Sequence, residues 1–151
     1  MYCDTEEAQL ALGGMLARHA DTPLTVHLVG DLGTGKTTLV RGFLRALGYE
    51  GAVRSPTFTL VEPYDFLDPP VYHLDLYRLG DPEELEYLGA RELLTEAAWR
   101  FIEWPQRGAG WLPRPDLEIE IRHHGNGRKL QFRAHTPAAW RAIGHLRQGK
   151  T

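Results

Sequence analysis

The fold of this chain is decided by residues 30–37, which read Gly30-Asp31-Leu32-Gly33-Thr34-Gly35-Lys36-Thr37. This is the pattern of a phosphate-binding loop. Two glycines are separated by four residues, and the second glycine is followed by a lysine and then by a hydroxyl residue. Glycine turns tightly at positive φ, so backbone N–H groups can point at phosphate oxygens with no Cβ in the way. The lysine reaches the β- and γ-phosphates, and the threonine hydroxyl can hold Mg²⁺. We therefore predict a nucleotide phosphate site made of Gly33, Thr34, Gly35, Lys36, Thr37 and Thr38.

Such a loop needs a strand before it and a helix after it, and the sequence indicates both. Leu24–Val29 is a compact apolar run rich in β-forming residues. A helix that would present its positive dipole end to the phosphates follows the loop and stops at Gly48. Its apolar residues recur at helical spacing and are Leu39, Val40, Phe43, Leu44 and Leu47. The flanking sequence therefore favours a functional loop over a chance match.

Length and composition fit one globular domain that spans residues 1–151. Of these residues, 42% are hydrophobic and 25% are charged, and no apolar run approaches the length of a membrane-spanning helix. The acidic N-terminus lacks the apolar core of a secretory signal, so we expect a cytoplasmic protein with no membrane partner. The formal net charge of −3 gives no general attraction to nucleic acid. We therefore expect no DNA binding and only indirect contact with RNA.

The remaining sequence predicts an α/β fold with a central mixed sheet flanked by helices. A first helix is capped by Asp4 or Thr5, and Thr136-Pro137 opens a C-terminal helix. A turn at Ser55-Pro56 runs into a strand, which pairs antiparallel with the strand after it. The expected strands beyond the phosphate loop cover 55–62, 71–77 and 97–104, and a β-hairpin at a sheet edge joins 117–122 to 129–134.

Two carboxylates at predicted strand ends are candidates for ATP hydrolysis. Asp75 follows an apolar run that His73 interrupts, and Glu103 follows Phe101 and Ile102. Hydrolysis requires a metal held against the phosphates and a group that orients the attacking water. In a largely parallel sheet, neighbouring strand ends meet the phosphate loop at one edge, so either acid can reach Mg²⁺. Spacing alone leaves open which of them binds the metal.

Hydroxyl residues that follow the first helix after the loop have two interpretations. Ser55, Thr57 or Thr59 either faces the γ-phosphate as part of a nucleotide-sensing switch or reflects ordinary turn chemistry and β propensity. A guanine-reading Asn-Lys-x-Asp sequence is absent, which favours adenine as the base. None of the 7 histidines has the spacing of a metal site. We therefore expect ATP and Mg²⁺ as ligands.

Taken together, these residues resemble the TsaE (YjeE) family, the ATPases of bacterial tRNA threonylcarbamoyladenosine synthesis. The matching blocks occur in the family's order and span roughly residues 24 to 113. They are Gly30–Leu39, Ser55–Glu62, His73–Leu79, Asp81–Glu86 and Ile102–Pro105. The first helix of that family usually carries a threonine before a Leu-Gly pair, where this chain has Gln9 before Leu12-Gly13.

The resemblance implies a small P-loop ATPase that works with TsaD and TsaB. That pair transfers a threonylcarbamoyl group to the tRNA adenosine 3′ to the anticodon, and the nucleotide cycle of the ATPase resets the transferase for further turnover. Hydrolysis is then weak without the partners, and tRNA is reached only through the complex. The motifs imply that Lys36 binds phosphate as a catalytic residue and that Thr37 and Glu103 are Mg²⁺ ligands. They also imply that Asp75 supports hydrolysis as a catalytic acid.

Two other classes of function stay open from the sequence. A small-molecule kinase needs an acceptor pocket and usually an arginine-bearing lid, for which 151 residues leave little room. A nucleotide-dependent binding module hydrolyses negligibly and signals through its switch segments. A phosphorylated small molecule among the products would indicate a kinase, and tight ATP binding without turnover would indicate the module.

Overall fold

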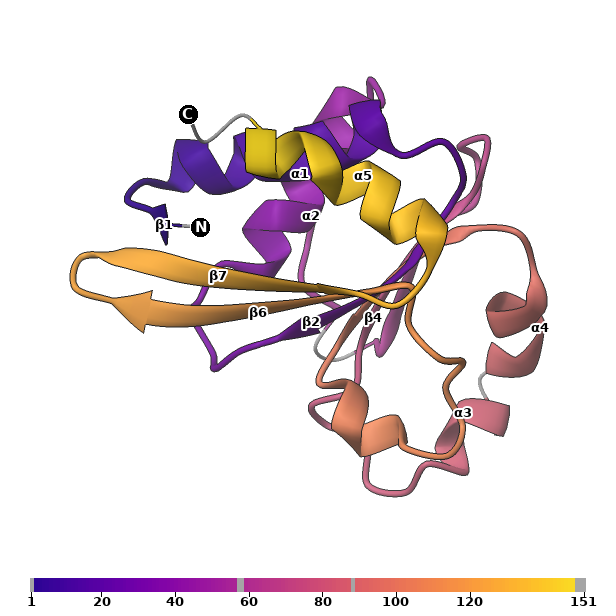
Figure 1. Ribbon diagram of the computed structural model, residues 1–151. Coiled ribbons are helices and arrows are strands. Elements are labelled where there is room, and N and C mark those ends of the chain that lie inside the picture. The colour runs from indigo at the N-terminus through magenta and orange to yellow at the C-terminus, as the bar shows by residue number, and fades with distance from the viewer. Residues whose placement is uncertain (1, 57–58, 88, 149–151) are drawn as a thin grey trace.

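The computed structural model describes residues 2–56, 59–87 and 89–148, and within these ranges seven strands form one sheet. The strands are β1 (Tyr2–Cys3), β2 (Thr25–Val29), β3 (Val61–Tyr64), β4 (Val71–Asp75), β5 (Trp99–Glu103), β6 (Leu117–His124) and β7 (Gly127–Ala134). Their order across the sheet is β1-β7-β6-β2-β5-β4-β3 (Figure 1). The strand that leads into the phosphate loop, β2, therefore lies at the centre with β5 and β6 beside it.

The middle of the sheet is parallel and its margins are antiparallel. Strands β6, β2, β5 and β4 run parallel, whereas β3, β7 and β1 pair antiparallel with their neighbours. This confirms the mixed sheet, the antiparallel pair and the hairpin that the sequence predicts. The prediction that the hairpin forms an edge is wrong, because the two residues of β1 continue the sheet beyond β7. A strand as short as Tyr2–Cys3 leaves no alternating pattern in the sequence to reveal it.

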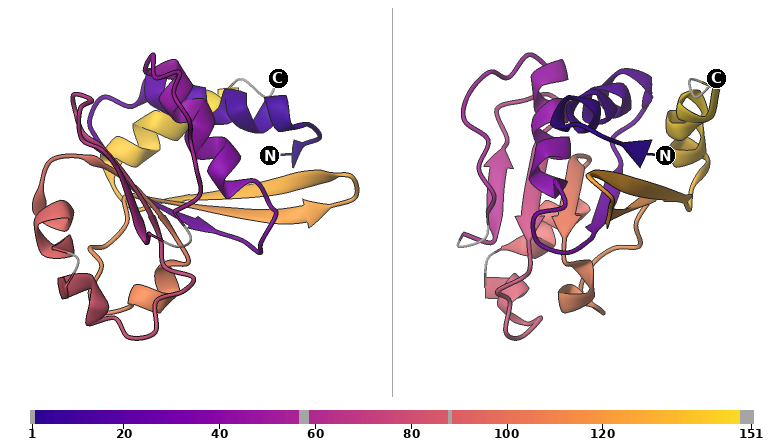
Figure 2. Two further views of the ribbon diagram at one scale, coloured as in Figure 1. Left: turned by 180° about the vertical axis from the view of Figure 1, so that it is seen from behind. Right: turned by 90° about the vertical axis from the view of Figure 1, so that its left-hand side faces the viewer.

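Helices cover both faces of the sheet (Figures 1 and 2). One face carries α1 (Glu6–His19), α2 (Lys36–Ala46) and α5 (Pro137–Gln148), and toward the other lie α3 (Glu84–Tyr87), α4 (Ala90–Thr95) and the 3₁₀-helix η1 (Pro105–Gly108). Because side chains alternate along a strand, Phe101 of β5 packs with α2 and Ile102 packs with the cluster on the other face. The predicted α/β class is confirmed. Of the described helices, none has the length and apolar character needed to cross a membrane.

The strand expected over residues 55–62 starts only at Val61, and β4 ends at Asp75 rather than Tyr77. Leu60 has a φ of +67°, and its N–H donates to the Pro56 carbonyl at 2.8 Å. A positive φ is incompatible with extended backbone, so the chain turns before it enters β3. Residues 57 and 58 lie outside the described ranges, so any role of the threonine at position 57 stays a prediction.

Two glycines bring α1 and α2 into backbone contact. A Cβ on Gly13 would lie 2.1 Å from the Leu39 carbonyl oxygen, and one on Gly42 would lie 2.0 Å from that of Leu10. Only a residue without a Cβ permits so close an approach. The first helix, whose N-cap is Thr5, therefore lies directly against the helix that follows the phosphate loop.

Candidate functional site

The phosphate loop joins the end of β2 at Val29 to the start of α2 at Lys36, as the sequence predicts. Gly33 and Gly35 have φ values of +78° and +95°, in the left-handed region that glycine enters without strain. Gly35 is also the N-cap of α2, so the loop leads directly into the helix N-terminus. The unpaired N–H groups of a first helical turn and the helix dipole together attract anions. The loop geometry is therefore suited to a phosphate chain.

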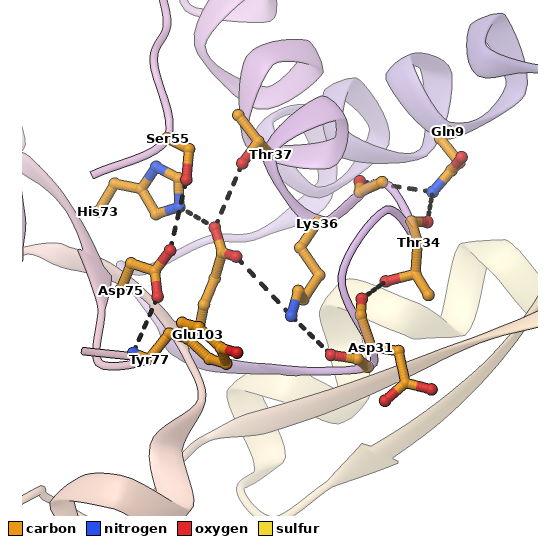
Figure 3. Close-up of polar contacts among 12 residues, drawn as sticks. Gln9, Asp31, Thr34, Lys36, Thr37, Ser55, His73, Asp75, Tyr77 and Glu103 are labelled. Carbon is orange, nitrogen blue, oxygen red and sulfur yellow. Dashed lines mark hydrogen bonds and ion pairs between the residues drawn. The ribbon is translucent and has the colours of Figure 1, made fainter. Parts of the chain in front are cut away.

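Lys36 is held inside the loop (Figure 3). Its side chain is 5% exposed, and its ammonium donates to the Gly30 carbonyl at 2.6 Å. The same nitrogen lies 3.9 Å from Glu103 Oε1 and 4.3 Å from the centroid of the Trp104 ring. Burial lowers the pKa of Lys36, and nearby carboxylates, Glu103 first, act against that shift. The ammonium is a partly desolvated positive charge at the loop, which favours an incoming phosphate.

The register of the parallel strands places the two candidate acids at one level. Asp75 on β4 pairs with Glu103 on β5. Alternation along the strands turns both carboxylates, and the ring of His73, toward the face that α2 covers. Asp75 is 3% exposed and Glu103 is 4% exposed. The structure therefore brings both acids to the end of the sheet where the phosphate loop lies.

Glu103 is the acid that contacts the loop threonine (Figure 3). Its Oε2 accepts a hydrogen bond from the Thr37 hydroxyl at 3.4 Å and lies 2.5 Å from His73 Nε2. A hydroxyl and a carboxylate are hard oxygen ligands of the kind that Mg²⁺ prefers. Among the described residues, no three His, Cys, Asp or Glu side chains gather to hold a metal by themselves. This donor set fits Mg²⁺ that is shared with phosphate oxygens and does not fit a zinc site.

Asp75 has different partners from Glu103. Its Oδ1 accepts from the N–H of Tyr77 at 3.0 Å, and its Oδ2 accepts from the Ser55 hydroxyl at 3.3 Å. The first contact fixes the carboxylate on the chain that leaves β4. The second connects it to the segment that leads from α2 toward β3. Ser55 is thus beside an acid of the site, while Thr59 lies in the turn before β3.

Two cavities adjoin the phosphate loop. One of about 270 Å³ lies between the start of α1, the loop and the tip of the β6–β7 hairpin, and its lining includes Gly33, Gly35 and Thr38. The other, of about 430 Å³, is lined in part by Gly30, Thr34 and Trp104. The first cavity opens beside the first turn of α2, where a nucleotide that enters the loop has room to extend.

Sequence reasoning missed three side chains of the site. In the sequence, His73 is a polar residue that interrupts an apolar run. In the structure, its ring is buried beside Glu103. Gln9 and Arg128 contact the loop from α1 and β7. The available signals for Gln9 are its position on the apolar row of the first helix and its place before Leu12-Gly13, where the family usually has a threonine. Nothing in the sequence connects Arg128 with a loop so distant along the chain.

Comparison with known families gives one match that spans most of the chain. A family model described as threonylcarbamoyl adenosine biosynthesis protein TsaE matches residues 3–130. The matched range contains the phosphate loop, both candidate acids and strands β2 to β6, together with the last residue of β1 and the first part of β7. The C-terminal helix α5 lies beyond it.

Individual proteins show the same similarity. The tRNA threonylcarbamoyladenosine biosynthesis protein TsaE of Haemophilus influenzae is 44% identical over 122 residues, which cover 81% of this chain and 77% of that protein. The protein of the same name from Bacillus subtilis is 36% identical over 129 residues, which cover 85% of this chain and 80% of that protein. The crystal structure of Bacillus subtilis YdiB matches with a TM-score of 0.79 at 28% identity, covering 97% of this chain and 92% of YdiB. The predicted P-loop α/β fold is therefore confirmed.

Proposed function

The chain belongs to the TsaE family of threonylcarbamoyl adenosine biosynthesis proteins, and we propose that it is the Mg²⁺-dependent ATPase of tRNA threonylcarbamoylation. In this proposal its residues 1–151 act as one P-loop ATPase unit that supports repeated turnover of a TsaD–TsaB transferase. The observation that carries the ATPase proposal is the convergence of Lys36, Thr37 and Glu103 at the N-terminus of α2. The partners rest on the sequence resemblance, and the cytoplasmic location stays the prediction made from the sequence itself.

The loop binds the phosphate chain through backbone and side chain. Its N–H groups and the dipole of α2 attract the anion. Lys36 exchanges the Gly30 carbonyl, which it now contacts at 2.6 Å, for phosphate oxygens. The exchange replaces a neutral acceptor with a charged one, so it strengthens the hydrogen bond of the ammonium. The adenosine then lies in the cavity beside Gly33, Gly35 and Thr38.

In this proposal Glu103 and Asp75 have different roles in hydrolysis. Thr37 and Glu103 would hold Mg²⁺, which would neutralise phosphate charge in the transition state. His73 keeps the Glu103 carboxylate on the side of the strand that faces Thr37. Asp75 supports hydrolysis from the neighbouring strand end, and its contact with Ser55 connects hydrolysis to the segment after α2. Movement of that segment would report the nucleotide state to a partner.

ATP turnover with and without the cognate TsaD and TsaB proteins tests this proposal. We expect slow turnover alone and stimulation by the pair, both lost in Lys36→Ala and Glu103→Ala. Glu118→Ala is the matched control, because Glu118 lies on β6 and its side chain is 31% exposed in a surface ion pair. Absence of both complex formation and stimulation would reject the role in tRNA modification. A phosphorylated small molecule among the products would indicate a kinase, and tight ATP binding without turnover would indicate a binding module.

A further inference from the structure

We propose that Gln9 and Arg128 are positioning residues that clamp the phosphate loop on the side where α1 and the β6–β7 hairpin lie, and that hold its N–H groups toward a di- or triphosphate. The inference rests on the proposed nucleotide site and names two residues that set its affinity. One comes from the N-terminal helix and the other from the C-terminal hairpin. Neither belongs to the phosphate-loop motif.

Gln9 is the clamp residue from α1 (Figure 3). It is 5% exposed, and its Nε2 donates to the Thr34 carbonyl at 2.9 Å and to the Gly35 carbonyl at 3.4 Å. A Cβ on Gly35 would lie 2.3 Å from that same nitrogen, so the amide packs directly on the loop backbone. The close contact between α1 and α2 at Gly13 fixes the helix that carries Gln9. The amide therefore acts from a rigid support.

Arg128 is the clamp residue from β7. Its Nη2 donates to the Gly33 carbonyl at 3.1 Å, and its Nη1 donates to the Gly127 carbonyl at 3.0 Å. Strand β1 pairs Cys3 with Arg128 and leads directly into α1. The two clamp residues are thus connected through β1 as well as through the loop. Through this connection β1 and the hairpin contact the loop that joins β2 to α2.

The planar trans peptide converts these contacts into an anion site. In each peptide unit the C=O of one residue and the N–H of the next point in opposite directions. When Arg128 holds the Gly33 carbonyl and Gln9 holds the Thr34 carbonyl on the clamp side, the N–H groups of residues 34 and 35 point to the other side. The Gly35 carbonyl accepts from the Leu39 N–H of α2 at 3.1 Å, so the N–H of residue 36 is oriented with the helix. Successive N–H groups that converge in this way form an anion-binding nest. The clamp thus orders the nest before a phosphate arrives, which reduces the ordering cost of binding.

The alternative role for Gln9 is a direct contact with the nucleoside, because Gln9 also lines the cavity beside the loop. Inorganic pyrophosphate separates the two roles, since it carries the phosphates without the nucleoside. We would measure the affinities of ADP and of pyrophosphate by displacement of a fluorescent ADP analogue. The variant Gln9→Met keeps the side-chain length and the charge but removes the donor. Gln131→Met makes the same change at an exposed glutamine on β7.

The clamp predicts that Gln9→Met weakens pyrophosphate and ADP alike, by about three- to tenfold, as expected for one lost hydrogen bond. Arg128→Lys, which keeps the charge but loses the planar donor fork, is expected to weaken both ligands as well. Arg133→Lys, at a side chain 58% exposed, is expected to leave both unchanged. Thermal unfolding of each variant distinguishes an effect on the loop from a general loss of fold. We expect the clamp variants to have the melting temperature of the wild type and still to bind pyrophosphate more weakly.

Weakened ADP binding with unchanged pyrophosphate binding in Gln9→Met would overturn the clamp and assign Gln9 to the nucleoside. Unchanged binding of both ligands in both clamp variants would overturn it too. A wild-type protein that binds neither ligand would remove the proposed nucleotide site and the clamp together. The failure of the clamp alone is therefore distinguishable from failure of the proposed function.

Discussion

Neutralising Glu103 should change the Mg²⁺ requirement of nucleotide binding far more than neutralising Asp75. The two acids face each other across β4 and β5, and both are buried. Among the carboxylates that the structure describes, only that of Glu103 contacts the Thr37 hydroxyl, at 3.4 Å. Glu103→Gln and Asp75→Asn each remove a charge with almost no change of volume. The pair of variants therefore isolates the charge that the proposed Mg²⁺ site requires.

The magnitude follows from the charge of the lost interaction. Hydrogen bonds and contacts to a charged group contribute about 1.5–3 kcal/mol, against about 1 kcal/mol for neutral pairs. At about 1.4 kcal/mol per factor of ten, Glu103→Gln should raise the Mg²⁺ concentration for half-maximal nucleotide binding about 10- to 150-fold. Asp75→Asn should raise it less than about threefold, because its partners are Tyr77 and Ser55 rather than the loop threonine.

The assay is a Mg²⁺ titration at fixed protein and fluorescent ADP analogue, repeated for wild type and both variants. Glu103→Gln retains an oxygen that accepts from Thr37 and His73, so we expect it to fold with a stability loss of about 1–3 kcal/mol. For a chain of this size that loss lowers the melting temperature by about 2–4 °C per kcal/mol, which thermal unfolding will show. A larger Mg²⁺ shift in Asp75→Asn than in Glu103→Gln would refute the assignment of Glu103 as the metal ligand.

Three further predictions follow from the contacts of single residues. Lys36→Met should weaken ADP binding about tenfold or more even without Mg²⁺, measured by calorimetry, because the phosphates lose a charged donor. Burial lowers the pKa of His27 in the folded protein. Below about pH 6.5 the unfolded chain therefore binds a proton at this histidine that the folded chain does not bind, so the free energy of unfolding falls as the pH drops below that value. Urea unfolding should show a smaller fall in His27→Gln and an unchanged fall in His124→Gln, at an exposed site. Gly13→Ala should destabilise the protein by about 1–3 kcal/mol in thermal unfolding because its Cβ meets the Leu39 carbonyl at 2.1 Å, whereas Gly144→Ala, with nothing within 4 Å, should not.

The phosphate loop is predictable because its information is local. The motif, the apolar strand before it and the periodic helix after it all lie within residues 24–48, and the structure forms them as expected. The strand ends that carry Asp75 and Glu103 are likewise visible as short apolar runs followed by an acid. These features depend on neighbouring residues, so a single sequence reveals them.

The remaining parts of the site depend on pairing between distant segments. The choice of Glu103 over Asp75 as the candidate metal ligand depends on which side chains contact each carboxylate. Spacing along the chain does not indicate these contacts. The contact of Arg128 with Gly33 exists because β6 pairs with β2 and β7 pairs with β6, whereas the sequence predicts the hairpin but not the strand that it joins. The late start of β3 depends on the positive φ of Leu60, which its residue type does not signal.

The most direct test of the proposed function is the number of rounds of tRNA threonylcarbamoylation that limiting TsaD–TsaB completes with a separately supplied threonylcarbamoyl donor, this protein and ATP. We expect many rounds with ATP, and arrest after about one round when a non-hydrolysable ATP analogue replaces it or when Lys36→Met replaces the wild type. Equal product with the analogue, or without this protein, would contradict the claim that ATP hydrolysis by this chain supports the transferase.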